Sequence, residues 1–274
     1  MNYTRLKVSL EKSVLNVTLA RPAVRNAFDA ETIAELTTVF KAAGVSNGSY
    51  ASARALVLSG EGASFCSGAD LGYMQSMAKF SRDENRTDAE RLFEMFESVR
   101  KCLVPVIVHA HGHAMGGAVG ITACADVTLA ETGTQFRFSE VRLGILPAVI
   151  SPFVLQKMNP SWARRWMITG EMFDATQAHA AGLVQFVGSK DDIETEKKKV
   201  IAALLEAAPE AVHATKMLIN EIGFEDPLAV RARVTEAIAE RRTSAEGQEG
   251  LNAFLGKREP SWRVGAAAGK KGGA

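Results

Sequence analysis

The sequence lacks the features that mark membrane, secreted and nucleic-acid-binding proteins. None of its apolar runs approaches the roughly 20 residues that a membrane-spanning helix needs. Its first residues, MNYTRLKVSLEK, contain no apolar core of the kind found in secretory signals. With 32 basic and 31 acidic residues, its formal net charge of +1 gives no bulk attraction to nucleic acid or anionic membranes. We therefore expect a cytoplasmic protein with neither nucleic acid nor a membrane as partner.

Cysteine is scarce, which excludes a disulfide-based scaffold. The three cysteines, Cys66, Cys102 and Cys124, form an odd set without CxxC spacing, so we expect free thiols in a reducing compartment. The spacing places no histidine to activate Cys66 as a nucleophile. His111 and His113 flank a glycine but lack the further ligands of a metal site. We expect no bound metal.

What the chain does have is a 47% hydrophobic composition and alternating strand and helix patterns. Strands are expected at 6–10, 14–19, 55–58, 106–110, 127–130, 135–138 and 183–187. Helices are expected at 30–43, 114–123, 192–207, 210–221, 227–242 and 245–255. Residues 79–91 are polar and are expected to be mobile at their start, and a helix is expected to follow them up to about 101. This order predicts an α/β fold with a helical C-terminal region.

The composition changes along the chain and divides it into three parts. Residues 1–190 are expected to form the core that carries the chemistry, and 191–262 a helical C-terminal region. The last part, 263–274, ends in GAAAGKKGGA, which has too few large apolar side chains to pack, so we expect it to be disordered.

Two glycine-bearing turns follow short apolar strands, FCSGAD at 65–70 and Gly116-Gly117. The second turn leads into a small apolar segment that suits a helix, whose first N–H groups have no partner within the helix. The helix dipole adds partial positive charge at the same place. Two such turns in one α/β chain can direct N–H groups at one carbonyl oxygen from two sides. We expect them to stabilise an oxyanion.

Glu140 is the single carboxylate of the apolar segment FRFSEVRLGILP, residues 136–147. Apolar surroundings raise the pKa of a carboxyl group, which suits proton transfer near neutral pH. The alternative is an ion pair with Arg137 or Arg142. The local sequence does not decide between these two interpretations.

Six motifs then follow one another along the chain. They are RPAVRNAF (21–28), FCSGADL (65–71), GHAMGGAVG (112–120), SEVRLGILP (139–147), ITGEMFDATQAHAAGLV (168–184) and EGLNAFLGKREPSW (249–262). In this order and spacing they resemble the crotonase (enoyl-CoA hydratase/isomerase) superfamily, up to about residue 262. The resemblance implies a spiral of ββα units followed by a helical C-terminal trimerisation region. It also implies an acyl-CoA thioester substrate, no separate cofactor, and a homo-oligomer, either a trimer or a dimer of trimers.

The resemblance assigns roles position by position. The N–H groups of Ala69 and Gly117 resemble the two oxyanion donors to the thioester carbonyl, and Glu140 matches the retained catalytic glutamate. The implied contacts to substrate and CoA are Arg25, Ser67, Gly68, Asp70, Gly116, Gly120 and Lys257. Arg25 resembles a position that meets a CoA phosphate. Lys257 and Arg258 either approach the CoA phosphates, in one arrangement from a neighbouring subunit, or are ordinary surface charges.

One position departs from the family's pattern. In ordinary hydratases of this family a second glutamate follows the double glycine by three residues, and here that position is Gly120. Three residues is nearly one helical turn, so a side chain there would overhang the side of the Gly117 N–H. We expect the glycine to leave open space and no proton carrier. General acid–base catalysis typically raises the reaction rate about 10²–10⁴-fold. A hydration that uses two glutamates would lack one of these groups here.

Three functions stay open. The first, which we favour, is an enoyl-CoA hydratase, a lyase acting on a branched or carboxylated enoyl-CoA, with substrate or water in the vacated space. The segment FSEVRLGILPAVISPFV resembles the methylglutaconyl-CoA and isohexenylglutaconyl-CoA hydratases of leucine and acyclic-terpene breakdown, and Arg142 then either pairs with a substrate carboxylate or forms a structural ion pair. The second is an enoyl-CoA isomerase that shifts a β,γ double bond to α,β with Glu140 as sole proton shuttle. The third is a weakly active CoA-ester-binding paralogue.

Overall fold

The computed structural model describes residues 2–263. All but the first residue of the tail expected at 263–274 therefore lies outside the described chain. Two compact units divide the protein, Met1–Lys198 and Lys199–Ala274. Their boundary falls inside helix α8 (Lys190–Glu206), eight residues beyond the expected end of the core at 190. Every strand of the described chain belongs to the first unit.

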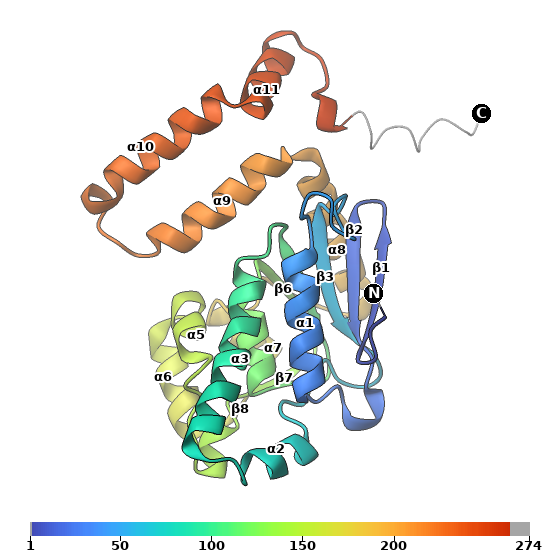
Figure 1. The fold of residues 1–274 in the computed structure, drawn as a ribbon, viewed down its shortest axis with the longest axis vertical. Helices are drawn as coiled ribbons and strands as arrows, with labels where there is room; N and C mark the ends of the chain where they lie inside the picture. Colours follow the sequence, from blue (N-terminus) through green and yellow to red (C-terminus); the bar gives the residue numbers. More distant parts are fainter. Residues whose placement is uncertain (1, 264–274) are drawn as a thin grey trace, which may run out of the picture. The chain divides into compact units, whose positions relative to one another are not determined.

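The strands of the first unit form two sheets (Figure 1). The larger has the order β1-β2-β3-β4-β6-β9, in which β1 and β2 are antiparallel and all other neighbours are parallel. In the smaller sheet β7 lies between β5, to which it is parallel, and β8, to which it is antiparallel. The strands are β1 (Leu6–Glu11), β2 (Val14–Leu19), β3 (Ala55–Gly60), β4 (Val106–Ala110), β5 (His113–Met115), β6 (Val127–Glu131), β7 (Gln135–Arg137), β8 (Met172–Asp174) and β9 (Phe186–Gly188).

The local sequence explains the strands of the larger sheet. Lys12 and Ser13, at φ 47° and 66°, form the two-residue turn of the expected β1–β2 hairpin. All five residues of β4 are buried, as is typical of a parallel strand covered on both faces. Strands β5 and β8 were not expected, because each has three residues and forms by pairing with distant segments: both pair with β7, and β5 also bridges to Cys66.

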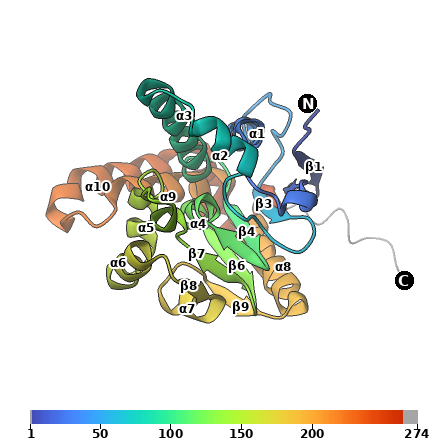
Figure 2. The same ribbon diagram turned by 90° about the horizontal axis from the view of Figure 1, so that it is seen from below.

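Helices α1 and α3 pack against each other and run side by side in both views (Figures 1 and 2). Asp29 caps α1 as expected by accepting the Thr32 N–H. The helix expected to follow the polar segment 79–91 instead begins at Arg82, where Ser81 and Glu84 form a capping box. The helices of the first unit are α1 (Ala30–Ala42), α2 (Leu71–Met77), α3 (Arg82–Arg100), α4 (Gly117–Cys124), α5 (Ser151–Lys157), α6 (Pro160–Thr169) and α7 (Ala175–Ala180), with short 3-10 helices η1 (Pro22–Val24) and η2 (Glu140–Leu143).

The connections repeat one pattern. Strand β4 joins the larger sheet, β5 the smaller one, and α4 follows; β6 and β7 repeat this before η2. The expected α/β fold of ββα units is confirmed in this repeat. The helix expected from 114 instead begins at Gly117, because Ala114 and Met115 pair with β7 as part of β5. This shift puts a helix N-terminus directly after a strand end.

The second unit is helical, as expected. It contains α9 (Pro209–Ile222), α10 (Pro227–Thr243) and α11 (Ala245–Leu255). The Glu246 carboxylate of α11 accepts the backbone N–H groups of Glu210 and Ala211, which closes the start of α9. Over residues 2–263, no helix combines the length and apolar character needed to cross a membrane.

Candidate active site

The first glycine turn, 65–70, is joined to the start of β5. The Cys66 N–H donates to the His113 carbonyl at 3.0 Å, and the Met115 N–H donates to the Cys66 carbonyl at 3.1 Å. Gly68 has φ +93°, and a Cβ on it would stand 3.1 Å from the Met115 carbonyl oxygen. Glycine is therefore required there, and the two turns noted in the sequence lie next to each other.

Ala69 presents its N–H away from the neighbouring backbone. The Phe28 N–H donates to the Gly68 carbonyl at 2.7 Å, and the Asp70 N–H donates to the Phe28 carbonyl at 2.8 Å. In a parallel bridge of this kind, the residue between those two bonds directs its own N–H to the other side. Ala69 is exposed, and within the described part of the chain its N–H has no acceptor.

Gly117 supplies a second free N–H at the first residue of α4. The preceding Gly116 has φ +52° and donates its own N–H to the Arg137 carbonyl at 2.9 Å. No acceptor for the Gly117 N–H is found among residues 2–263. A Cβ on Gly117 would stand 3.3 Å from the Phe28 ring, so the residue that bridges to Ala69 also packs below Gly117.

Glu140 lies beside this helix start without an ion pair. Its Oε1 is 3.4 Å from the point where a Cβ on Gly116 would stand, and its buried Oε2 has no hydrogen-bond partner. Burial raises the pKa of the Glu140 carboxyl, opposed in part by a hydrogen bond to its own backbone. Arg137 and Arg142 instead donate their Nε to the Gly170 carbonyl at 2.7 and 2.9 Å. The ion-pair interpretation of Glu140 is therefore wrong.

The open space expected beside Gly120 does not exist. Gly120 is buried, and a Cβ on it would stand 2.4 Å from Ile150 Cγ2 and 2.8 Å from Phe96 Cε1. Real Cβ atoms do not approach neighbours this closely, so the glycine is required by packing. Neither a substrate group nor a water occupies this volume, because apolar side chains fill it. Position 120 therefore packs against the core where a Cβ would stand, and its assignment to the substrate site stays a prediction.

Arg25 and Ser67 are held together beside the first turn. The Ser67 N–H donates to the Arg25 carbonyl at 3.0 Å, and Ser67 Oγ donates to the Val24 carbonyl at 3.3 Å. Arg25 is exposed with φ +51°, and its guanidinium has no partner in the described chain. The backbone thus holds a free cation next to the Ser67-Gly68 turn.

Asp70 has a structural use that the sequence analysis did not predict. Its carboxylate accepts the Gly72 and Tyr73 N–H groups at the start of α2, and pairs with the Arg21 guanidinium at 3.0 Å. Arg21 also donates to the Ala27 carbonyl at 2.6 Å. Its carboxylate thus fixes the loop that carries the neighbouring Ala69 N–H, and the assignment of Asp70 to substrate contact stays a prediction.

Asn26 is a site-building residue that the sequence analysis missed. It is 1% exposed and has φ +56°. Its Oδ1 accepts the Arg21 N–H at 2.9 Å, and its Nδ2 donates to the Glu61 and Ser64 carbonyls, both at 2.8 Å. Asparagine tolerates the left-handed conformation better than most residues, which is the one signal that RPAVRNAF offered. Asn26 ties this segment to the loop after β3.

The two neighbouring basic residues of the second unit, Lys257 and Arg258, differ in their contacts. Arg258 forms two bonds to the Glu249 carboxylate, at 2.8 and 2.6 Å, and this partner lowers the pKa of Glu249 to about 2. Lys257 is exposed, with φ +51°. Of the two, only Lys257 presents a cation that the described chain does not already pair.

The three cysteines are buried thiols that form no disulfide, as expected. Burial raises the pKa of the Cys66 thiol to about 12, which leaves it protonated and a poor nucleophile at neutral pH. Within residues 2–263, no group of three or more histidine, cysteine, aspartate or glutamate side chains could hold a metal ion.

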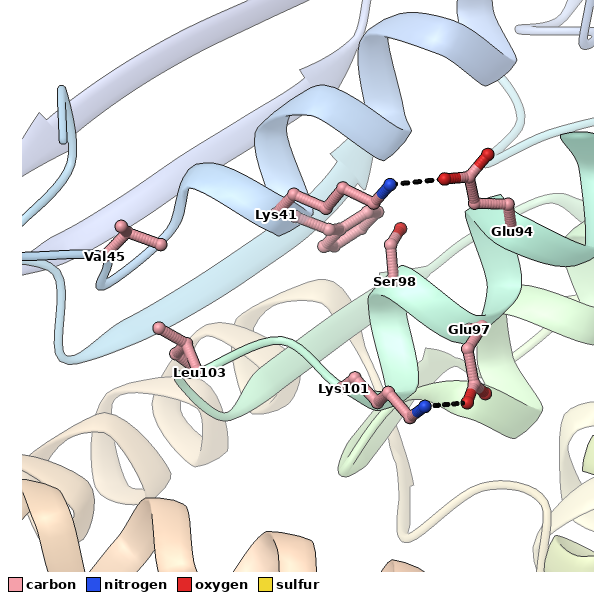
Figure 3. Close-up of a pocket in the computed structure, with 8 residues that line it drawn as sticks. Lys41, Val45, Glu94, Glu97, Ser98, Lys101 and Leu103 are labelled. Atoms are coloured by element: carbon pink, nitrogen blue, oxygen red, sulfur yellow. Dashed lines mark hydrogen bonds and ion pairs between the residues drawn. The ribbon is translucent and has the colours of Figure 1, made fainter.

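A separate groove of about 430 Å³ lies between α1 and α3 (Figure 3). Its apolar lining includes Phe40 and Leu103. Lys101 pairs with Glu97 at 2.8 Å, and a second ion pair joins Lys41 to Glu94 at its rim (Figure 3). None of the residues assigned from the sequence lines this groove.

The site thus combines two free N–H groups from adjacent turns with one buried, unpaired carboxylate. A sequence model described as enoyl-CoA hydratase/isomerase matches residues 9–265. The chain belongs to the enoyl-CoA hydratase/isomerase family. The solved structure of an enoyl-CoA hydratase from Shewanella pealeana is 35% identical with a TM-score of 0.88, covering 95% of this chain and 97% of that one. The expected crotonase fold is confirmed by this likeness.

Two curated members of the family are similar over nearly their whole length. The crotonyl-CoA hydratase of Syntrophomonas wolfei is 26% identical over 264 residues, which cover 96% of this chain and 99% of the relative. The 2,3-dehydroadipyl-CoA hydratase of Escherichia coli is 27% identical over 264 residues, covering 95% and 99%.

Proposed function

We propose that this enzyme is an enoyl-CoA hydratase-type lyase that adds water across the α,β double bond of an acyl-CoA thioester, or removes it. The observation that carries the proposal is the unpaired carboxylate of Glu140 beside the helix start at Gly116. The names of the similar proteins, crotonyl-CoA hydratase and 2,3-dehydroadipyl-CoA hydratase, support the same reaction.

The free N–H groups of Ala69 and Gly117 are the proposed oxyanion donors. Both hydrogen-bond the thioester carbonyl oxygen, and their interaction strengthens as that oxygen gains negative charge in the enolate. Because both are backbone groups held by the strand and turn contacts, they need no reorganisation during the reaction. Removing one such donor typically costs about 10²–10³ in rate.

Glu140 is the proposed acid and base. Its carboxylate takes a proton from water while the water oxygen bonds to C3 of the acyl chain, and it then returns that proton to C2. Both atoms added to the double bond come from one water, so a single carboxylate completes the proton balance. The raised pKa of Glu140 brings its proton affinity closer to that needed near neutral pH.

Enoyl-CoA isomerisation is the second candidate, and the packing at Gly120 favours it. Moving a double bond from β,γ to α,β needs one base that carries a proton between two carbons. Ile150 and Phe96 fill the place of a second carboxylate, so position 120 supplies no carboxylate that could share this task with Glu140. The same oxyanion donors serve both reactions.

An assay of the purified protein with crotonyl-CoA, methylglutaconyl-CoA and a β,γ-enoyl-CoA separates the candidates. Hydration of either α,β-unsaturated ester supports the hydratase. Rapid conversion of the β,γ ester without any hydration would establish the isomerase instead. Tight binding of all three esters without turnover would leave a CoA-ester-binding paralogue. In the two active cases, Glu140→Gln should lower turnover about 10²–10⁴-fold.

We also propose that the acyl chain is branched or carboxylated. The similarity to the Escherichia coli 2,3-dehydroadipyl-CoA hydratase supports an acyl chain of this kind. Arg142 is a poor partner for a substrate carboxylate, because its Nε already donates to the Gly170 carbonyl. A higher kcat/KM for methylglutaconyl-CoA than for crotonyl-CoA is the expected result, and the reverse order would remove this proposal.

The CoA part of the substrate serves as its handle, and no separate cofactor is proposed. Arg25 is the proposed phosphate contact near Ser67-Gly68, and Lys257 a second one. We propose a homo-oligomer, a trimer or dimer of trimers, because the second unit exposes Phe224, Leu228 and Phe254 by 88, 80 and 82%. Light scattering should give the mass of three or six chains; a monomer would contradict it.

A further inference from the structure

Ser139 directly precedes Glu140 and stands at the N-terminal boundary of η2. A serine at such a boundary ordinarily accepts a hydrogen bond from a backbone N–H of the first turn. The Ser139 hydroxyl forms no such bond, and the rest of the described chain offers it no hydrogen-bond partner either. Its side chain is half-buried. Because the hydroxyl has no hydrogen-bond partner in the described chain, no contact gives it a structural role.

The hydroxyl points to the same place as the Glu140 carboxylate. Ser139 Oγ and Glu140 Oε1 each lie 3.4 Å from the point where a Cβ on Gly116 would stand. Residue 116 carries no Cβ, so both oxygens border one small space at the start of α4, next to the free Gly117 N–H. A hydroxyl and a carboxylate that border one space are suited to hold a water between them.

We propose that Ser139 Oγ positions the attacking water against Glu140, an inference that rests on the proposed hydratase function. The water donates one O–H to the Glu140 carboxylate and the other to Ser139 Oγ. The first proton passes to Glu140 as the water oxygen bonds to C3, and the π electrons of the double bond move onto the thioester oxygen. Glu140 then protonates C2. Ser139 exchanges no proton and acts only as an acceptor.

The packing at position 120 explains why a hydroxyl from η2 would be used. The resemblance places a second glutamate of ordinary hydratases at this position, and here Ile150 and Phe96 close it. The water therefore needs its second contact from another element. Ser139 provides the hydroxyl nearest in sequence to the proposed catalytic carboxylate, and its Oγ borders the same space beside Gly116.

The test compares two reactions of the full-length enzyme that differ in their need for a held water. Hydration of crotonyl-CoA or methylglutaconyl-CoA needs it, whereas exchange of the C2 proton of butyryl-CoA with D₂O needs only Glu140 and the oxyanion donors. Ser139→Ala should lower kcat for hydration about tenfold, the loss of one hydrogen bond, with KM and exchange unchanged. Ser139→Thr keeps a hydroxyl and should restore most of the rate. Ser161→Ala, at an exposed serine of α6, is the matched control.

The outcomes separate this inference from the function on which it rests. Wild-type enzyme that hydrates neither ester overturns both. Wild-type hydration with an unchanged Ser139→Ala rate overturns the role of Ser139 alone. An equal fall of hydration and exchange in Ser139→Ala also overturns it, because the serine would then act through the position of Glu140. A tenfold fall in hydration alone, restored by threonine, supports it.

Discussion

Two glycines about one helical turn apart have different structural roles: Gly116 immediately precedes α4, and Gly120 lies within it. Gly116 has φ +52°, which L residues rarely adopt, and the Gly117 N–H that follows it has no acceptor in the described chain, while Glu140 Oε1 lies 3.4 Å from the point where a Gly116 Cβ would stand. At Gly120 the missing side chain makes room for Ile150 and Phe96. The first glycine belongs to the proposed reaction site, and the second packs into an apolar core. A glycine in a catalytic motif therefore does not by itself indicate room for a ligand.

This difference concentrates the proposed proton chemistry on one residue. The side of α4 that carries a carboxylate in ordinary hydratases is apolar here, while the Glu140 carboxylate is buried and unpaired. Hydration and isomerisation both remain compatible with one base, so their balance depends on whether a water is held beside it. The predictions below concern either the polar surroundings of Gly116 or the apolar surroundings of Gly120.

The largest effect on activity is expected from Gly116→Ala. Gly116→Ala forces an L residue to φ +52° and places a methyl group 3.4 Å from Glu140 Oε1. Because this shifts the oxyanion turn, kcat/KM should fall about 10²–10³-fold. Gly133→Ala is the matched control, since Gly133 has φ +116° with nothing within 4 Å. Enzyme assays on both should show loss of activity only in the first; equal losses would mean that backbone strain alone explains it.

Substitution of Gly120 should change the stability of the protein. Gly120→Ala places a Cβ 2.4 Å from Ile150 Cγ2, and overpacking of this kind costs about 1–3 kcal/mol. Ile150→Ala removes that atom, so the double variant should be more stable than the sum of the single effects predicts. Denaturant unfolding of the four proteins measures this coupling. If Gly120→Glu alone accelerated crotonyl-CoA hydration, the closed volume described here would be wrong.

The buried carboxylate of Glu140 should lower the stability of the folded protein when it is ionised. Its pKa is higher in the folded than in the unfolded state, so its contribution is fully present below the ordinary value of 4.5 and is lost as the pH rises through the folded pKa. Glu140→Gln should therefore be more stable than wild type at neutral pH, by on the order of 1 kcal/mol. Thermal unfolding at several pH values should show this gap closing toward pH 4.5. The exposed Glu90→Gln is the control, and a gap of equal size there would refute the explanation.

The smallest effect on kinetics is expected from replacing Arg25, the exposed cation beside the Ser67-Gly68 turn. Exposed ion pairs contribute about 0.2–1 kcal/mol, so Arg25→Ala should raise KM about 2–5-fold and leave kcat unchanged. Lys12→Ala, at another exposed cation with positive φ, should change neither. Steady-state kinetics in low and high salt checks this, because the Arg25 effect should shrink with salt.

Local patterns predicted the parts of the fold that depend on neighbours in sequence. The hairpin at Lys12-Ser13 and the Asp29 cap follow from such patterns, as do the C-terminal helices. Strand β8 could not be predicted, because Met172–Asp174 becomes a strand only by pairing with β7.

The site was predictable where the motif itself supplies the group, as at Glu140. It was not predictable where distant side chains decide. Phe96 and Ile150 come from elsewhere in the sequence to close the volume at Gly120, and no local pattern reports this. The same is true of the Gly170 carbonyl, which binds two arginines and so leaves Glu140 unpaired.

The pH dependence of kcat/KM for the best enoyl-CoA substrate, measured for wild type and Glu140→Gln, tests the central claim most directly. With Glu140 as the only acid and base, wild-type activity should be lost on acidification through a single ionisation above the ordinary value of 4.5. Glu140→Gln should lack that ionisation and be about 10²–10⁴-fold slower. A variant with the wild-type rate, or one that keeps the same ionisation, would contradict the account.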